Sequence, residues 1–219
     1  MKIGIIGAGN IGGTLARRLV EEGHSVAIAN SRGPETLTEL AEESGAEPVT
    51  AEHAARGREL VVVTIPMKNV PSLPDDLFDG VDQSVVVVDT CNYYPRERDG
   101  RIASIEEGMT ESRWVSEQIG RPVVKAFNNI HSDHLLENGK PSGTPERIAL
   151  PVAGDDEADK AVVMELVDQL GFDPVDDGGL DDSWRQQPGT PCYGANLDAA
   201  SLKATLAETP ASRPEEFTA

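Results

Sequence analysis

The chain has 219 residues, 38% of them hydrophobic and 26% charged, and no apolar run approaches the roughly 20 residues needed to cross a bilayer. Asp and Glu number 38 and Lys and Arg only 19, so the formal net charge is -19 at pH 7, which opposes binding to nucleic acid phosphates or anionic lipids. The composition therefore predicts a globular protein that has neither nucleic acid nor membrane partners.

The N-terminal part of the sequence contains two apolar runs that each lead into a helical pattern. Residues 2–6 form a short apolar run that ends in glycines, and apolar residues at helical spacing follow over 11–23. A second run at 25–29 leads through Gly33 and Pro34 into a helix that Gly45 closes. This pattern predicts a βαβ unit followed by a further helix.

Three later apolar runs, at 60–65, 85–88 and 123–127, are continuous rather than alternating. Continuous runs rich in β-branched residues are typical of parallel strands whose two faces are both covered. Weaker helical patterns lie between them, at 51–56 and 111–119. The predicted fold class is therefore α/β, with a doubly wound, mostly parallel Rossmann sheet.

The C-terminal part contains one more α/β unit, a strand at 147–152 and a helix at 157–170. A loop follows Gly179, then a short helix at 196–206 and a polar tail rich in Pro and Glu. We predict a Rossmann domain over residues 1–150 and a small C-terminal α/β extension with a frayed tail over 151–219.

The start of the chain and the cysteines indicate the compartment. MKIGIIGAG lacks the basic region, apolar stretch and cleavage site of a secretory signal, so we expect a cytoplasmic protein. Cys91 and Cys192 stand far apart without a CxxC pair, which argues against a disulfide scaffold or a zinc ribbon. We expect two reduced thiols and no metal site.

A glycine motif, GxGxxG, stands between the first predicted strand and the first predicted helix. In this context the motif is typical of dinucleotide binding, because the glycines allow a tight turn and a close approach of the pyrophosphate to the helix N-terminus. A glycine turn without a ligand is the alternative. The candidate pyrophosphate-binding residues are Gly7, Ala8, Gly9, Asn10, Ile11 and Gly12.

The end of the second predicted strand indicates which dinucleotide is bound. An NAD-binding unit usually carries Asp or Glu about 20 residues after the motif, and no acidic residue stands there. Instead Asn30, Ser31 and Arg32 precede a predicted helix N-terminus at Pro34, which together suit a ribose 2′-phosphate. We therefore predict NADP(H); the alternative is that Arg32 is a solvated turn residue.

Beyond these residues the chain resembles the NADP oxidoreductases that depend on the 8-hydroxy-5-deazaflavin coenzyme, F420. It is also similar to the cytosolic reductase domain of the six-transmembrane metalloreductases. The shared motifs lie at 7–12, 30–32, 64–66, 124–128 and 152–156 and span residues 1 to about 180. The resemblance implies hydride transfer between NADP(H) and a flavin-like ring, and it implies a homodimer that acts on a small-molecule redox substrate.

The resemblance also implies further cofactor-binding residues in three loops beyond the carboxyl ends of the strands, at 64–67, 90–94 and 128–131. The first loop would pack on the riboses, and Asn128 would hydrogen-bond the nicotinamide carboxamide. The candidates are Thr64, Ile65, Pro66, Met67, Asn92, Ala126 and Asn128. We assign no catalytic side chain, since positioning supplies much of the rate of hydride transfer.

Several alternatives stay open at this point. The segment after Gly179 does not reproduce the family's terminal segment, so the hydride acceptor is a deazaflavin, FMN, FAD or another conjugated molecule. Non-catalytic NADP(H)-binding redox sensing, or reduction of a small imine or ketone, are alternative functions. Cys91 is redox-active or a packing residue, and His131 and His134 are metal ligands or solvated. Tyr93, Tyr94 and Tyr193 stack on an acceptor or pack in the core.

Overall fold

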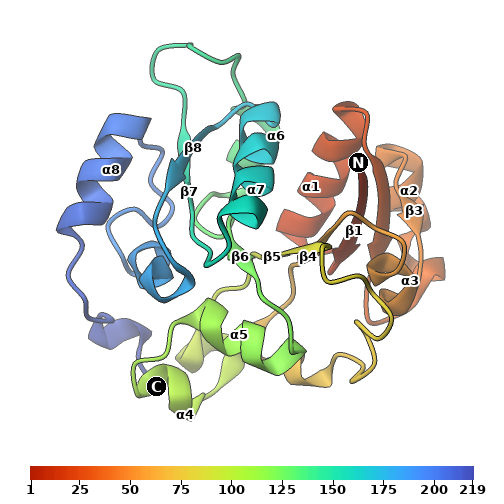
Figure 1. The fold of residues 1–219 in the computed structure, drawn as a ribbon, viewed down its shortest axis with the longest axis horizontal. Coiled ribbons are helices and arrows are strands. Elements are labelled where there is room, and N and C mark those ends of the chain that lie inside the picture. Colours follow the sequence, from red (N-terminus) through yellow and green to blue (C-terminus); the bar gives the residue numbers. More distant parts are fainter.

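The computed structural model describes all 219 residues and is built around a parallel sheet of six strands (Figure 1). The strand order is β3-β2-β1-β4-β5-β6, which is the order of a doubly wound Rossmann sheet. The strands are β1 Lys2–Ile6, β2 Ser25–Ala29, β3 Glu47–Pro48, β4 Leu60–Val63, β5 Val86–Asp89 and β6 Val124–Lys125. Every pairing within this sheet is parallel, and the predicted fold class is confirmed.

Helices cover both faces of the sheet. The α-helices are α1 Asn10–Glu21, α2 Thr38–Ser44, α3 Ala51–Ala55, α4 Ala103–Glu106, α5 Glu111–Ile119, α6 Ser132–Glu137, α7 Glu157–Gln169 and α8 Ala199–Glu208. Other helical segments are η1 Pro34–Leu37, η2 Met67–Ser72, η3 Pro95–Asp99, η4 Leu180–Gln186 and η5 Glu215–Phe217.

The continuous apolar strands are buried on both sides, as their pattern predicts. In β4, Leu60 and Val62 join the core cluster that contains α1 and α7. Val63 joins a second cluster with α5, and Val61 joins a third with α3. Alternate residues of one strand therefore face opposite helical layers, because successive side chains of a strand point to opposite faces.

A second, two-stranded parallel sheet follows, with β7 Ala149–Val152 and β8 Asp173–Asp176. It is linked to the first sheet by an antiparallel bridge between Lys125 and Ala153. The helix α7 connects its strands and shares the largest core cluster with β1 and β2. The division of the chain at residue 150 stays a prediction.

The third apolar run is shorter as a strand than its sequence predicts. The run spans 123–127, but β6 contains only Val124 and Lys125. Phe127 has a φ of 59°, in the left-handed region that a bulky residue rarely adopts, and this turn ends the strand. The turn directs the chain across the carboxyl edge of the sheet and into α6, a helix that the sequence analysis did not predict.

The C-terminal tail, residues 210–219, lies beside α4 and α5 (Figure 1). The frayed end that the sequence predicts stays a prediction. Arg96 donates hydrogen bonds to the carbonyls of Glu215 and Thr218 over 2.9 Å each, and the N–H of Ala219 reaches Glu106. No helix in the structure combines the length and the apolar composition that a membrane span requires.

Candidate functional site

The turn between β1 and α1 requires glycine at two positions for packing. Gly7 has a φ of 118°, and a Cβ there would lie 2.1 Å from the carbonyl oxygen of Thr64. A Cβ at Gly12 would lie 1.9 Å from the carbonyl oxygen of Gly7. These contacts let β1, α1 and the loop after β4 approach closely, as a dinucleotide-binding turn requires.

Gly9 serves a different purpose, because no atom lies within 4 Å of the position that its Cβ would take. It caps the 12-residue helix α1 without a side-chain hydrogen bond, and the first turn of α1 contains no acidic residue. The unpaired N–H groups at the start of α1 therefore face open space that suits an anion. These residues fit a bound diphosphate.

A cleft of about 790 Å³ opens beside this turn, at the carboxyl ends of four neighbouring strands. Its lining comes from the loops after β1, β2, β3 and β4 and from the segment that contains η2. The lining residues are Ile6, Gly7, Ala8, Gly9, Ala29, Asn30, Ser31, Arg32, Gly33, Thr50, Ala51, Glu52, Thr64, Ile65, Pro66, Asn69, Ser72, Leu73 and Pro74. This edge of a Rossmann sheet is where the fold places its ligands.

The loop after β2 holds Arg32 at the rim of the cleft. Asn30 accepts a hydrogen bond from the backbone N–H of Arg32 over 2.9 Å and donates one to Thr36, so the turn is fixed by its own side chains. The guanidinium of Arg32 makes no ion pair and no hydrogen bond within the protein. It is therefore available to a ligand.

The helix N-terminus predicted at Pro34 is weaker than expected. η1 is a four-residue turn that begins with Pro34, which has no N–H to donate. The carboxylate of Glu35 also lies against Gly33, 2.5 Å from the position of a Cβ there. The positive charge at this end of the cleft therefore comes from Arg32 rather than from a helix dipole.

The structure brings only some of the predicted cofactor-binding residues together in this cleft. Those that line it are Gly7, Ala8, Gly9, Asn30, Ser31, Arg32, Thr64, Ile65 and Pro66. Asn10 faces a neighbouring hollow beside Arg17, while Met67 and Ala126 are fully buried in the core. Sequence reasoning missed the lining of residues 50–52 and 69–74, since these follow a two-residue strand and a Pro-rich turn without a motif.

Asn92 and Asn128 bind each other at the carboxyl ends of β5 and β6. The amide Nδ2 of Asn128 donates to Asn92 Oδ1 over 3.1 Å and to the carbonyl of Gln186 over 2.7 Å, and Asn92 Nδ2 donates to the carbonyl of Asn128. Asn128 is 3% exposed, and its Oδ1 has no partner in the protein. That buried oxygen is an acceptor without a donor in the protein.

A buried ionic network fixes the loop that carries Asn92. Lys125 and Asp89 are fully buried, with 3.2 Å between Nζ and Oδ2, and Lys125 also donates to the carbonyl of Cys91. Ser112 donates to the same carboxylate over 2.6 Å. The network fixes the loop after β5 and leaves no charge there unpaired. The only sign of this network in the sequence is Lys125, a lysine within an otherwise apolar run.

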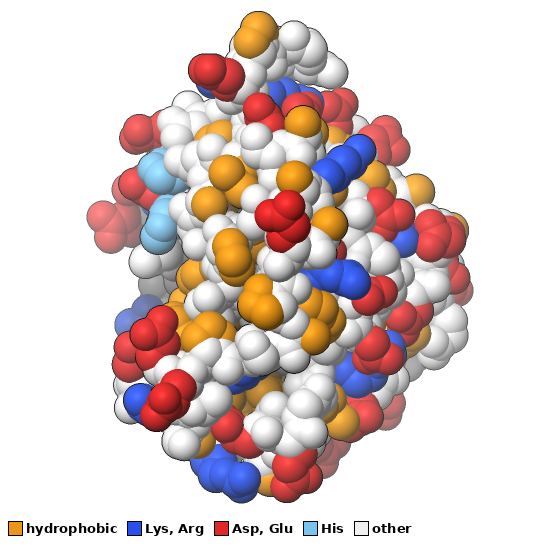
Figure 2. All heavy atoms as spheres, turned by 90° about the vertical axis from the view of Figure 1, so that its left-hand side faces the viewer, with side chains coloured by type: hydrophobic (Ala, Val, Ile, Leu, Met, Phe, Trp, Pro, Cys, Tyr) orange, Lys and Arg blue, Asp and Glu red, His pale blue; other side chains and the backbone are white.

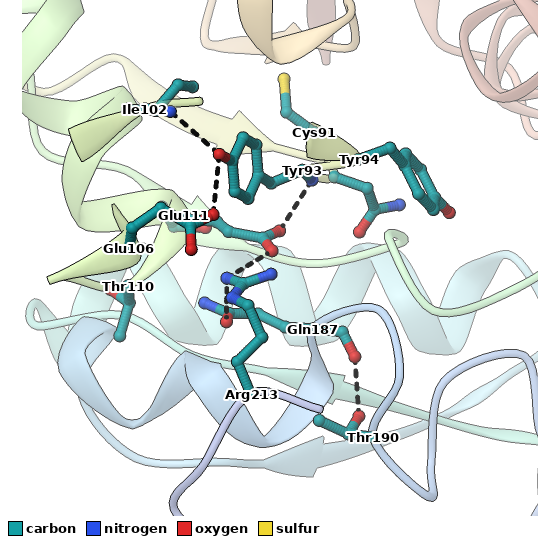
Figure 3. Close-up of polar contacts among 12 residues, drawn as sticks. Cys91, Tyr93, Tyr94, Ile102, Glu106, Thr110, Glu111, Gln187, Thr190 and Arg213 are labelled. Carbon is teal, nitrogen blue, oxygen red and sulfur yellow. Dashed lines mark hydrogen bonds and ion pairs between the residues drawn. The ribbon is translucent and has the colours of Figure 1, made fainter. Parts of the chain in front are cut away.

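The three tyrosines have different surroundings, two of which Figure 3 shows. Tyr94 and Tyr193 share a hydrogen bond between their hydroxyl groups, and the guanidinium of Arg98 lies 5.0 Å from the ring centroid of Tyr94. Burial raises the pKa of Tyr193, so its phenol is neutral. Tyr93 is fully buried and donates to Glu106 over 2.9 Å, which makes it a packing residue rather than a stacking platform.

The cysteines and histidines show no reactive arrangement. Cys91 is 3% exposed, and burial raises the pKa of its thiol, which favours packing over redox chemistry. His131 and His134 contact each other edge to face with 5.6 Å between ring centroids, and His134 hydrogen-bonds Asn196. No group of three or more His, Cys, Asp or Glu side chains is placed to hold a metal ion.

Comparison with known proteins agrees with this geometry. Residues 2–93 match the model of the family described as NADP oxidoreductase, coenzyme F420-dependent. This match covers less than half of the chain. The chain is also 30% identical to the metalloreductase STEAP3 of Rattus norvegicus over 180 residues, which are 82% of this chain and 34% of that protein. Both resemblances predicted from the motifs are thereby confirmed.

Solved structures show the same fold in similar proteins. SMa0349 from Sinorhizobium meliloti is 31% identical with a TM-score of 0.75, and the match covers 90% of this chain and 95% of that one. A protein from Arthrobacter sp. FB24, provisionally named an F420-dependent NADP reductase, is 23% identical with a TM-score of 0.67 over 84% and 87% of the two chains.

The curated relatives are longer than the part that this chain matches. The matched segments cover 47% and 34% of their lengths, so the chain spans about half of them or less. What the comparisons share with this chain is a similarity to NADP oxidoreductases over residues 2–93 and the Rossmann fold.

Proposed function

We propose that the protein binds NADP(H) in the cleft beside the glycine turn and exchanges a hydride with a flavin-like acceptor. One observation carries this proposal. A single cleft of about 790 Å³ contains both the open turn at Gly9 and the guanidinium of Arg32, which has no partner in the protein. A nucleotide with a diphosphate and an additional phosphate has anionic groups for both places. The match of residues 2–93 to the NADP oxidoreductase family model supports the same cofactor.

The adenosine end of the cofactor would lie against the loop after β2. Arg32 can donate two hydrogen bonds in a fixed fork to a 2′-phosphate, and Ser31 adds a hydroxyl. Glu52, whose pKa is lowered by the hydroxyl of Thr50, keeps a negative charge elsewhere in the lining of the cleft. The phosphate would therefore lie on the side of Arg32.

The nicotinamide end would pass Ile65 and Pro66 toward the pair of Asn92 and Asn128. The Oδ1 atom of Asn128 has no partner in the protein and would accept a hydrogen bond from the cofactor, and Asn92 and Gln186 fix the orientation of its amide. These contacts suit the N–H groups of a carboxamide. When bound, NADPH supplies the hydride, and the residues of the chain contribute position rather than proton transfer.

The acceptor would be a conjugated ring, a deazaflavin, FMN or FAD. Tyr94 and Tyr193 are joined through their hydroxyl groups, and Asn92 donates to Tyr193 over 3.2 Å, so an aromatic wall stands beside the nicotinamide position. Hydride transfer needs donor and acceptor atoms about 3–3.5 Å apart, which a flat wall and a fixed carboxamide can enforce. We assign no catalytic side chain.

Cofactor preference tests the proposed site. We expect Arg32→Gln to weaken NADPH binding by about 10- to 100-fold, because charge-assisted hydrogen bonds to the 2′-phosphate are lost, and to change NADH binding by less than about threefold. Isothermal titration calorimetry measures both. Arg56→Gln, at an exposed arginine outside the cleft, is the matched control. Equal losses for the two nucleotides in Arg32→Gln would disprove the assignment.

Turnover tests the reaction. The protein is mixed with NADPH and, separately, with the deazaflavin coenzyme, FMN, FAD or a ferric chelate, and the absorbance of reduced nicotinamide is followed. We expect oxidation of NADPH with at least one ring acceptor. Tight NADPH binding without turnover on any of them would instead support a redox sensor.

A further inference from the structure

A second cavity, of about 390 Å³, lies between η4, the α4–α5 segment and the C-terminal tail, and it shares no lining residue with the nucleotide cleft. Its volume falls within the range of about 300–1,000 Å³ that is usual for small-molecule sites. Trp184 and Met109 contribute apolar surface, and Thr110, Gln187 and Arg213 contribute polar groups. Most of the other lining residues are not hydrophobic, so hydrogen bonds as well as the aromatic wall would hold a ligand there.

Two buried hydrogen-bond donors in its wall lack an acceptor. Gln187 is 6% exposed, and its Nε2 has no partner, while its Oε1 accepts a hydrogen bond from Arg213 over 2.8 Å. Arg213 Nη1 is likewise buried and without a partner, although Nη2 lies 2.9 Å from the carboxylate of Glu111 (Figure 3). Buried donors without an acceptor are costly, so an acceptor oxygen placed here would stabilise the folded protein.

The charges around the cavity indicate that this oxygen is neutral. Arg213 is paired with Glu111, and Asp181 is paired with Arg113 over 2.7 Å. Glu106 accepts hydrogen bonds from Tyr93 and from the N–H of Ala219 but has no cation within ion-pair distance. An anionic ligand would therefore meet a surplus carboxylate, in a protein whose net charge is already -19.

We propose that this cavity binds a small neutral molecule that carries a carbonyl oxygen on a planar ring, such as an aromatic amide or ketone. The carbonyl accepts from Gln187 Nε2 and Arg213 Nη1, and the ring lies along the apolar wall that includes Trp184. Because the tail supplies Arg213, the ligand also ties the tail to the body of the protein. The proposal does not depend on the proposed NADP(H) site.

Benzamide and benzoate test the proposal, because they have the same shape and differ in charge. The indole N–H of Trp184 is followed by two-dimensional NMR of the ¹⁵N-labelled protein, and Trp184→Phe assigns its signal against that of Trp114, which lies outside the cavity. We expect benzamide to shift the Trp184 signal saturably, with a dissociation constant on the order of 1 mM for so small a probe, and benzoate to bind at least about tenfold more weakly. Comparable or tighter binding of benzoate, or no saturable shift with either probe, would overturn the proposal.

A donor-to-acceptor substitution provides the second measurement. Gln187→Glu keeps an oxygen for Arg213 but removes the Nε2 donor, and we expect benzamide binding to fall at least about tenfold. Gln118→Glu introduces the same charge at an exposed position outside the cavity and should bind benzamide as the wild type does. Unchanged affinity in Gln187→Glu would show that this donor does not bind the ligand.

Discussion

Gly9 and Gly12 lie three positions apart, and we expect them to respond differently to substitution by alanine. Gly9 has φ −80° and open space at its Cβ position, so alanine is compatible with the fold there. We expect Gly9→Ala to change the free energy of unfolding by less than about 0.5 kcal/mol. We expect NADPH binding to weaken about 10-fold or more, because the methyl group would occupy space over the helix N-terminus.

Gly12→Ala should show the reverse order of effects. Its Cβ would approach the carbonyl oxygen of Gly7 to 1.9 Å, so the turn must shift, at a cost of about 3 kcal/mol or more. Urea unfolding and calorimetry on both variants separate the two contributions. A Gly12→Ala protein as stable as the wild type would contradict the close packing of this turn.

Asp177 is a buried carboxyl group that should make stability depend on pH. Its side chain is 2% exposed, and burial raises its pKa from the ordinary 3.8 to about 7, against the opposing influence of Arg185. Between these values the folded protein retains a proton that the unfolded chain has released, so the folded state loses stability as pH rises from about 4 to 7.

Asp177→Asn should remove this dependence. We expect the variant to gain about 2–3 kcal/mol relative to the wild type between pH 5 and pH 8, measured by urea unfolding at both values. Asp79→Asn, at an exposed carboxyl group, is the control and should give no such gain. A constant difference between Asp177→Asn and wild type across this range would refute the assigned pKa.

The C-terminal strap, defined as residues 210–219, is held chiefly by one buried ion pair. Glu111 on α5 is fully buried, and Arg213 of the strap is its cation at 2.9 Å and lies over the ring of Tyr93. Burial raises the pKa of Glu111, while Arg213 lowers it. Removing Arg213 would leave a carboxylate in the core without its main partner, which is a costly arrangement.

Arg213→Met should therefore lower the free energy of unfolding by about 2–4 kcal/mol, and by less than about 1 kcal/mol in a Glu111→Gln background. A double-mutant cycle by urea unfolding measures the difference. Arg96→Met is the control, because it removes exposed hydrogen bonds to the strap. It should lower the free energy of unfolding by about 1 kcal/mol or less. Equal losses from Arg213→Met in both backgrounds would show that Glu111 does not hold the strap.

The excess of negative charge affects the stability of the whole molecule. Figure 2 shows acidic side chains distributed around one face, with fewer basic ones among them, and the formal net charge is -19. This repulsion is screened as the Debye length falls from about 10 Å at 0.1 M salt to about 3 Å at 1 M. We expect the melting temperature to rise by several degrees over this range of NaCl. A falling melting temperature would show that ion pairs such as Arg17 with Glu43 dominate instead.

The homodimer stays a prediction that the resemblance supports. Size-exclusion chromatography with light scattering at 0.1 M and 1 M NaCl tests it, since screening of like charges should favour association. A mass equal to one chain of 23.4 kDa under both conditions would exclude the dimer.

The sequence alone determined the features that depend on neighbouring residues. The glycine turn at residues 7–12 was predictable because a tight turn and a close helix impose glycine locally. The bounds of α5 were predictable because Thr110 caps its first turn and Gly120 adopts the left-handed conformation at its end. Continuous β-branched runs identified the central strands because burial on two faces leaves no polar alternation.

Only the tertiary structure decided which residues far apart in the sequence come into contact. Asn128 is oriented by Gln186, 58 residues away, and Glu111 receives its cation from Arg213 in the strap. Phe127 adopts a left-handed turn that its apolar run does not indicate, and Met67 of the predicted cofactor loop points into the core. Periodicity and capping arise from hydrogen bonds within a few residues, whereas a binding site is formed by side chains that only the packed fold brings together.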